Sequence, residues 1–393
     1  MHSVTLKITD RYAGPLLLKE GLRPFFLLAN LWAALCVMLW VAILVGVVEG
    51  PEQIAAIDWH RHELLFGYTS AVISGFLLTV VANWTGRAPI AGNLLLGLVL
   101  LWLAGRIVMW YPLDLPLAMV AVVDLAFPTV LGFLVGRELI LGRNFRNLRV
   151  LAVFALFVVA NGVFHYELVS GTRPLVGSKL GLGTVLLLIM LVGGRIIPAF
   201  TRNWLMRRDS KRLPKPFGAY DMATLGVSVI VLSNWAFSGE SRLLAWGMLL
   251  AGLLHLGRLA RWCGEQTFPD PLVLILHIAY AFIPLGFLAM AAAQLWTLHI
   301  TVSAAIHLWT TGAVAVTCMA VMTRASLGHT GQKLAVSPTI VAIYVFLLCS
   351  VLLRFVASTS PNYLLMIQLS TVLWCLAHLM FVFRYARLFY TTR

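Results

Sequence analysis

Long apolar runs separated by short polar segments dominate the pattern along this chain. A helix needs about 20 apolar residues to cross the roughly 30 Å of hydrocarbon in a bilayer. Twelve runs approach or exceed this length, near residues 25–48, 63–83, 91–110, 115–136, 149–164, 176–198, 219–237, 243–260, 272–293, 300–322, 337–357 and 363–385. The pattern therefore predicts an all-α, polytopic membrane protein with about twelve transmembrane helices.

The polar segments indicate how the chain is organised. The gaps between apolar runs are too short for a soluble domain, and the N-terminal segment is too polar and too long for a signal peptide. We therefore predict a cytoplasmic N-terminal tail (1–24), a single twelve-helix transmembrane domain (25–385) and a cytoplasmic C-terminal tail (386–393).

Three of the predicted helices, the second, sixth and tenth, align without gaps over residues 62–87, 178–203 and 307–332. The alignment pairs His62 with His307 and Gly67 with Gly312. It suggests three repeats of a four-helix unit, although chance matches in low-complexity apolar sequence are the alternative. In a true repeat, His62 and His307 lie at equivalent depths, and their side chains could converge near a common axis.

Composition and charge support the membrane assignment and set an orientation. The chain is 61% apolar and 11% charged, far from the balance of a soluble domain. Basic residues near helix ends are retained on the cytoplasmic side. If both termini are cytoplasmic, only six basic residues fall in outer segments, namely Arg61, Arg106, Arg173, Lys179, Arg242 and Arg354. The net charge of +14 then reflects topology and contact with anionic lipid, which argues against a nucleic-acid partner.

The five cysteines are scattered, mostly within predicted spans, and no C-x-x-C occurs. This spacing argues against disulfides and iron–sulfur clusters, and the absence of C-x-x-C-H argues against covalently attached haem.

One group of ionisable residues gathers at the outer ends of the second and tenth predicted helices. Its members are His60, His62, Glu63, His299 and His307. Ionisable side chains within a bilayer cost about 2.5–3.5 kcal/mol on insertion scales, so they are by default buried, paired or functional. Because histidine nitrogen is a preferred ligand of haem iron and copper, the group is a candidate metal site.

The start of the second helix affects how this group is arranged. If the helix begins early, one face carries residues at helical spacing, namely His60, Glu63, Gly67, Ser70 and Ser74, while His62 points from a neighbouring face. The alternative is a satisfied interfacial set in which Glu63 pairs with Arg61 or His60 in a wet loop.

A second group lies toward the inner side and contains Arg195, His277, Arg324 and His329. Arg195 follows two glycines and precedes a helix-breaking proline. It could hold a propionate or another anion, or it could extend to the membrane interface.

The other polar residues within spans have simpler explanations. Helix–helix hydrogen bonds account for Asp124 and for the stripe Gln368, Thr371, Cys375 and His378, although Asp124 could also belong to a proton path. His2, His165 and His255 fit tail or helix-boundary positions.

Six blocks of sequence resemble the NnrS family. They are "LRPFFLLA" (22–29), "WHRHELLFGY" (59–68), "GFLLTVVANWTG" (75–86), "GGRIIPAFT" (193–201), "LHIAY" (276–280) and "RASLGHTG" (324–331). The blocks span most of the chain. Arg61, Leu64 and Ala82 depart from the usual family pattern, whereas the histidines are retained.

The resemblance implies a bacterial inner-membrane protein that contains non-covalent, b-type haem and copper and takes part in nitric oxide metabolism or resistance to nitrosative stress. By position, it implies metal ligands among His60, His62, His277, His307 and His329. Arg195 and Arg324 are then candidate cofactor-binding residues. We expect His62 and His307 to be the leading ligands, His60 a third, and His277 a separate or opposite axial ligand.

The sequence therefore leaves two functions open. The first is a haem and copper protein that binds, senses or turns over nitric oxide, where turnover would require a membrane electron donor and a proton path. The second is a secondary transporter that uses Arg195, Asp124 and the histidines as substrate or proton sites, with helices interrupted at Pro128, Pro198 and Pro284.

Overall fold

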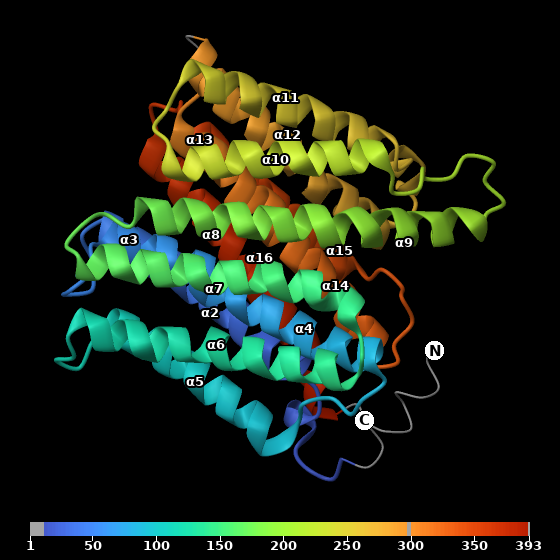
Figure 1. Cartoon of the computed structure of the whole chain (residues 1–393), viewed down its shortest axis with the longest axis horizontal. Coiled ribbons are helices and arrows are strands. Elements are labelled where there is room, and N and C mark those ends of the chain that lie inside the picture. Colours follow the sequence, from blue (N-terminus) through green and yellow to red (C-terminus); the bar gives the residue numbers. More distant parts are fainter. Residues whose placement is uncertain (1–11, 297–299, 392–393) are drawn as a thin grey trace. The chain divides into compact units, whose positions relative to one another are not determined.

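The structure is a computed structural model that describes residues 12–296 and 300–391; His2 and His299 lie outside these ranges. The described residues form helices joined by short loops, with no β-strand among them (Figure 1). All twelve predicted runs are helical, and eleven helices in this part of the chain are long and apolar enough to cross a membrane. The chain is therefore an all-α, multi-pass membrane protein, as the sequence predicts.

The first compact unit comprises Met1–Gly181, Met322–Lys333 and His378–Arg393. Its helical elements are η1 (Leu16–Leu18), α2 (Leu22–Leu44), α3 (Ala56–His62), η2 (Glu63–Tyr68), α4 (Thr69–Thr85), α5 (Gly92–Trp110), α6 (Leu117–Leu141), η3 (Phe145–Asn147) and α7 (Leu148–Val169). Helix α4 packs against α2 and α6, and α6 packs against α5 and α7. This packing brings side chains from α3, α6 and α7 together.

The second unit comprises Leu182–Val321 and Leu334–Ala377. It contains η4 (Ile189–Gly193), α9 (Gly194–Met206), α10 (Ala219–Phe237), α11 (Arg242–Ala260), η5 (Gly264–Thr267), α12 (Pro271–Leu295), α13 (Val302–His307), η6 (Leu308–Val316) and α15 (Pro338–Ala357). Helix α12 packs against α11, α13 and η6. Three helices contribute residues to both units, namely α8 (Leu175–Leu188), α14 (Thr317–His329) and α16 (Tyr363–Thr391).

Local sequence signals set several helix starts in the second unit. The side chains of Ser241, Asp270, Thr301 and Ser337 each accept a hydrogen bond from a backbone N–H in the first turn of α11, α12, α13 and α15. Pro271 and Pro338 occupy the first turns of α12 and α15, where the missing N–H costs no helical hydrogen bond. These caps explain why the predicted boundaries agree so closely with the observed ones.

Helix α10 differs from the other predicted spans because it is not among the helices that are apolar enough to cross a membrane. It carries buried Asp221, Thr224 and Ser228. The charge of Asp221 is balanced within the unit by Arg258 of α11, whose Nε donates to the carboxylate at 2.8 Å. The predicted run is therefore a helix whose polar residues are paired inside the protein.

Three spans contain a stretch of π-helix, η2, η4 and η6, within the three helices that align in the sequence. η2 begins directly after His62 and η6 directly after His307, while η4 begins farther along its span. A π-helical turn holds an extra residue and therefore rotates the faces of the helix that follows. The shared position after the two histidines agrees with the proposed repeat, which stays a prediction.

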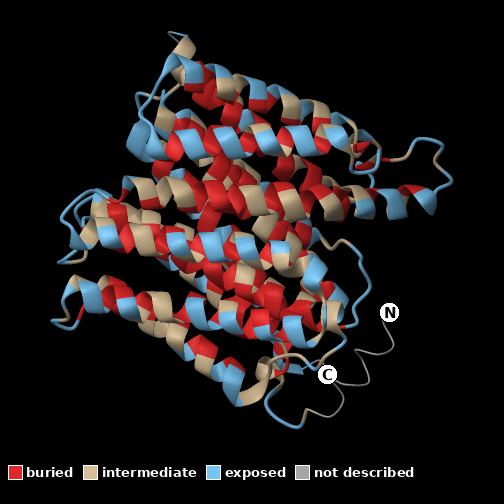
Figure 2. Cartoon of the chain, in the orientation of Figure 1, coloured by how far each residue is buried: buried red, intermediate tan, exposed pale blue. Residues whose placement is uncertain are grey.

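Exposed residues recur along the helices (Figure 2), and many of them are large and apolar. Phe133 on α6 is 72% exposed and Ile230 on α10 is 70% exposed. Such exposure would be costly in water, whereas in a bilayer these side chains contact lipid.

Candidate metal centre

A cluster of three buried metal-ligand side chains lies within the first unit. It consists of His62 at the end of α3, Asp124 on α6 and His165 on α7. One ligand atom from each residue lies within 4.8 Å of the others. We call these three residues the His62 cluster.

Hydrogen-bond distances tie the cluster together through Asp124. Its Oδ2 lies 3.2 Å from His62 Nε2 and 3.0 Å from His165 Nε2. Asn161, one helical turn before His165, donates to the same oxygen at 2.7 Å, and its own Oδ1 lies 3.0 Å from His62 Nε2. Three helices are thus joined at one carboxylate.

The other side of His62 is held by Glu63, which is completely buried. Glu63 Oε1 lies 3.0 Å from His62 Nδ1. Glu63 Oε2 accepts hydrogen bonds from Trp32 Nε1 at 2.8 Å and from Arg106 Nη1 at 2.5 Å. Arg106 also forms an ion pair with Asp124, so one guanidinium links both carboxylates.

The protonation of His62 follows from its neighbours. Both ring nitrogens face acceptor oxygens, which an imidazolium satisfies by donating from both sides. Together with Arg106, an imidazolium at His62 balances the two carboxylates. A metal ion at Nε2 would take the place of one proton and leave Nδ1–H donating to Glu63, as in many metal-ligating histidines.

The donor set is that of a small metal-ion site. Two imidazoles and a carboxylate are ligands of iron, copper and zinc ions. Aromatic rings pack against His62, with centroids 5.4 Å away for Phe66 and 5.0 Å for Phe164. The cluster therefore suits an ion-sized group, and these rings shield it from water.

Other predicted ligands of the first unit lie elsewhere. His60 stacks on Trp40 with ring centroids 4.5 Å apart, and His329 lies 3.8 Å from Glu20. Arg324 is half-buried on α14. Among the predicted ligands of the first unit, His62 belongs to the cluster with Asp124 and His165, whereas His60 and His329 have other partners.

The remaining predicted residues belong to the second unit. Arg195 is half-buried on α9, and His277 is buried on α12. His307 is half-buried, and its Nδ1 lies 2.7 Å from the backbone oxygen of Ser303. Because His62 and His307 belong to different units, their convergence at one site stays a prediction.

The hydrogen bond of His307 indicates which of its ring nitrogens carries the hydrogen. A carbonyl oxygen only accepts hydrogen bonds, so Nδ1 of His307 carries the hydrogen and Nε2 carries the lone pair. A hydrogen bond from Nδ1 to a backbone carbonyl often fixes the orientation of metal-ligating histidines.

His255 is excluded as a ligand by the same reasoning. The hydroxyl of Ser228 donates to Thr224 O, so Ser228 Oγ accepts from His255 Nε2 at 2.9 Å. The hydroxyl of Tyr280 accepts from Arg258 and donates to His255 Nδ1, also at 2.9 Å. Both nitrogens of His255 are engaged, and the residue is buried within α11, so the expectation of a helix-boundary position is wrong for His255.

Three further interpretations from the sequence need correction. His165 is no helix-boundary residue, because it is buried within α7 beside Asp124. Arg106 lies within α5 and is 4% exposed, so it is no outer-loop charge. Glu63 pairs with neither Arg61 nor His60 in a wet loop, since Arg61 pairs with Asp58 at 2.7 Å.

The sequence did hold a signal for the missed residues. Asn161 and His165 are spaced by four, which places both on one helix face. Arg106 stands in an otherwise apolar run and therefore needed a buried partner.

Comparison with known protein families gives a match over nearly the whole chain. The family model described as NnrS protein matches residues 16–393. The chain belongs to the NnrS family. A comparison with curated proteins found no match.

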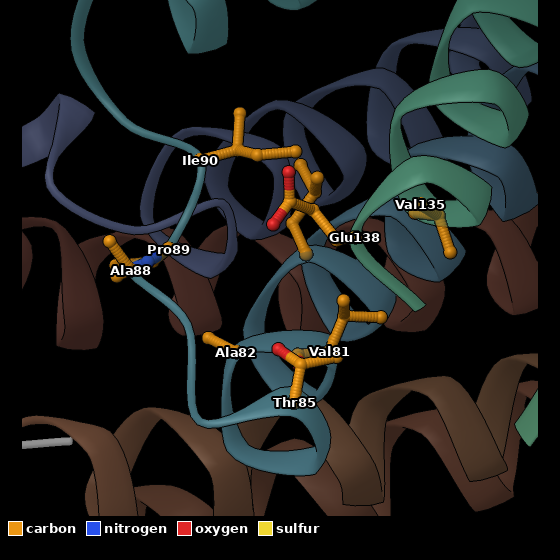
Figure 3. A pocket seen from close by; sticks show the side chains of 9 residues that line it. Val81, Ala82, Thr85, Ala88, Pro89, Ile90, Val135 and Glu138 are labelled. Atoms are coloured by element: carbon orange, nitrogen blue, oxygen red, sulfur yellow. The ribbon is translucent and has the colours of Figure 1, made fainter. Parts of the chain in front are cut away.

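This NnrS chain also has a small pocket in its first unit, lined by Leu78, Val81, Ala82, Thr85, Ala88, Pro89, Ile90, Val135 and Glu138 (Figure 3). Its volume of about 10 Å³ corresponds to one water molecule. Glu138 is held by Arg87 at 2.5 Å. The pocket is therefore too small for a cofactor.

Proposed function

We propose that this protein is a haem- and copper-binding membrane protein that acts in nitric oxide metabolism or resistance to nitrosative stress. The observation that carries the proposal is the buried His62 cluster in a chain of the NnrS family. Burying two imidazoles and two carboxylates in a membrane protein is costly unless they are paired or bind a ligand. A metal ion bound by these side chains would account for their burial at one place.

In this proposal the His62 cluster holds the copper ion. His62 Nε2, His165 Nε2 and one oxygen of Asp124 are the ligand atoms. Glu63 positions His62 through Nδ1, and Trp32 and Arg106 hold Glu63 in place. A copper ion bound here would supply a site that binds small diatomic ligands and exchanges electrons.

Haem is assigned to the second unit. His307 would hold the iron through Nε2, because its Nδ1 is committed to Ser303. Arg195, in the same unit, is the proposed partner of a haem propionate. Arg324, His60 and His329 lie in the first unit and stay candidate cofactor or metal-binding residues there. No covalent attachment is required, which corresponds to b-type haem.

Nitric oxide suits this setting, because it is small and uncharged and partitions into an apolar membrane interior. The residues support binding or sensing as well as turnover, and turnover would draw on a membrane electron donor. We place the protein in the bacterial inner membrane with both termini in the cytoplasm, as the distribution of basic residues favours.

The test is the metal content of the purified, full-length protein. We expect a Soret absorption band, a pyridine haemochrome spectrum of b-type haem, and copper by elemental analysis. A preparation from cells well supplied with haem and copper that contains neither would overturn the proposal.

One set of observations favours a secondary transporter as the alternative. The buried ion pairs of Arg106 with Glu63 and Asp124 could serve as substrate or proton sites. Pro128, Pro198 and Pro284 lie inside helices, and π-helices interrupt three spans, as expected of broken transport helices. Proton-coupled uptake by vesicles containing metal-free protein would favour this alternative.

A further inference from the structure

The end of α9 and the loop to α10 concentrate positive charge in the second unit. Between residues 202 and 217 the sequence has one acid, Asp209, and six basic residues, which are Arg202, Arg207, Arg208, Lys211, Arg212 and Lys215. All six basic side chains are exposed. Figure 1 shows the end of α9 and this loop extending past the ends of α10 and α11.

The length of the span that carries this segment places it at the membrane surface. The span Leu175–Met206 has 32 residues. At 1.5 Å per residue, a helix of this length measures about 48 Å, whereas the hydrocarbon of a bilayer is about 30 Å thick. The charged end of α9 therefore leaves the hydrocarbon and reaches the layer of lipid headgroups.

The loop is held against the segment that joins α11 to α12. The backbone N–H of Lys215 donates to the carbonyl oxygen of Arg261 at 3.1 Å, and Arg212 forms an ion pair with Glu265 at 2.7 Å. These contacts fix the loop before any ligand binds. Its exposed cations therefore keep a defined arrangement, which lowers the entropy cost of binding.

Most of these cations are not neutralised within the protein. Among the described residues, Arg212 is the one basic side chain of residues 202–217 that forms an ion pair. Arg208 stacks on Trp204 with its charge centre 4.2 Å from the ring centroid, which leaves its charge uncompensated. Exposed guanidinium and ammonium groups without acidic partners attract phosphate groups, which accept hydrogen bonds from them.

Exposed apolar side chains lie in the same segment. Met206 is 54% exposed and Phe217 is 44% exposed. Arg202 and Met206 are four residues apart on α9, so a cation and an apolar side chain share one helix face. A soluble anion gains nothing from such apolar side chains, whereas the boundary between headgroups and acyl chains accommodates both kinds of residue.

We propose that residues 202–217, which we call the basic surface, bind the phosphate groups of an anionic phospholipid at the membrane surface. Arg207, Lys211 and Lys215 contact the phosphates, and Met206 contacts the acyl chains. Clusters of basic residues next to a membrane span are attracted to anionic lipid. The bound lipid stabilises the end of α9 and the loop, whether or not the protein holds a metal.

The test is thermal unfolding of the purified, full-length protein in a neutral detergent with added phosphatidylglycerol or phosphatidylcholine. We expect phosphatidylglycerol, the anionic lipid, to raise the unfolding temperature more than phosphatidylcholine does. Arg207→Gln combined with Lys211→Gln should lose most of this difference, because two uncompensated cations are removed from exposed positions. Equal unfolding temperatures of the wild-type protein in the two lipids would overturn the proposal.

The matched control combines Arg173→Gln with Arg242→Gln. Both side chains are exposed, and Arg242 begins α11, at the opposite end of α10 from the basic surface. This variant loses the same charge and should keep the full effect of phosphatidylglycerol. An equal loss in both double variants would show that net charge alone is responsible, and would overturn the site.

A second comparison separates a lipid from a soluble anion. Met206→Ser leaves the charge of the basic surface intact, yet it should reduce the number of phosphatidylglycerol molecules that native mass spectrometry finds bound. Inorganic phosphate at the same concentration should not replace the lipid. Stabilisation by inorganic phosphate as large as that by phosphatidylglycerol would identify a soluble anion as the ligand and would reject the lipid.

Discussion

At the scale of residues, the histidines differ in their hydrogen-bond partners. Both ring nitrogens of His255 have partners, whereas Nδ1 of His307 lies against the backbone oxygen of Ser303. His62 faces oxygens on both sides and shares Asp124 with His165. The residue type alone does not distinguish these environments.

Replacing His165 tests the His62 cluster at this scale. We expect His165→Gln and His62→Ala to lower the copper content at least tenfold, because each removes a ligand. His255→Gln and His378→Ala should leave the copper content nearly unchanged. Elemental analysis of the four purified variants is the measurement, and equal copper in all of them would contradict the assignment.

At the scale of elements, π-helix η2 explains why the predicted stripe was partly wrong. The second span begins at Ala56, which is the early start that the sequence left open. The regular spacing that grouped His60 with Glu63 does not describe the side-chain partners, because Glu63 contacts His62 while His60 stacks on Trp40. The π-helical stretch from Glu63 also rotates the positions after it relative to an ideal α-helix.

Gly67 within η2 makes room for the ion pairs around the His62 cluster. A Cβ added there would lie 2.3 Å from Arg106 Nη1 and 2.7 Å from Glu63 Oε2. We expect Gly67→Ala to displace Arg106 and to destabilise the protein by about 1–3 kcal/mol, the usual cost of overpacking. Copper content should fall with it, because Glu63 no longer holds His62 in position.

Gly97→Ala is the matched control, since a Cβ on Gly97 of α5 would meet nothing within 4 Å. It should stabilise the helix by about 0.5–1 kcal/mol, because alanine is the better helix former. Thermal unfolding in detergent compares the two variants. Equal stability of Gly67→Ala and the wild-type protein would refute the packing argument.

At the scale of the whole molecule, the arrangement of charge predicts the orientation. Arg106, which the sequence places in an outer segment, is buried in ion pairs with Glu63 and Asp124. The remaining basic residues are concentrated in a few segments, such as 137–149 and 202–215, which cytoplasmic termini would place on the inner side.

A reporter fusion tests that orientation. Green fluorescent protein fused to the C-terminus should fluoresce, because it folds in the cytoplasm, whereas alkaline phosphatase at the same position should be inactive. The reverse result would place the C-terminus outside and would reject the inner assignment of the basic segments.

Much of the fold could be predicted because a bilayer imposes a simple requirement on each segment separately. Every backbone group must be satisfied within its own helix, so apolar runs and their caps reveal where helices lie. The site could be predicted only in part. His62 stood out beside Glu63, but His165 and Arg106 looked like boundary charges because their partners lie on other helices.

The sequence by itself determined the membrane-spanning helices, most of their ends and the family of the chain, since each depends on local composition and order. Only the tertiary structure decided that His62 meets Asp124 and His165, and that Arg106 forms ion pairs with Glu63 and Asp124. The physical reason is that such contacts join side chains on different helices, so they depend on how the helices pack and on how each helix is rotated about its axis.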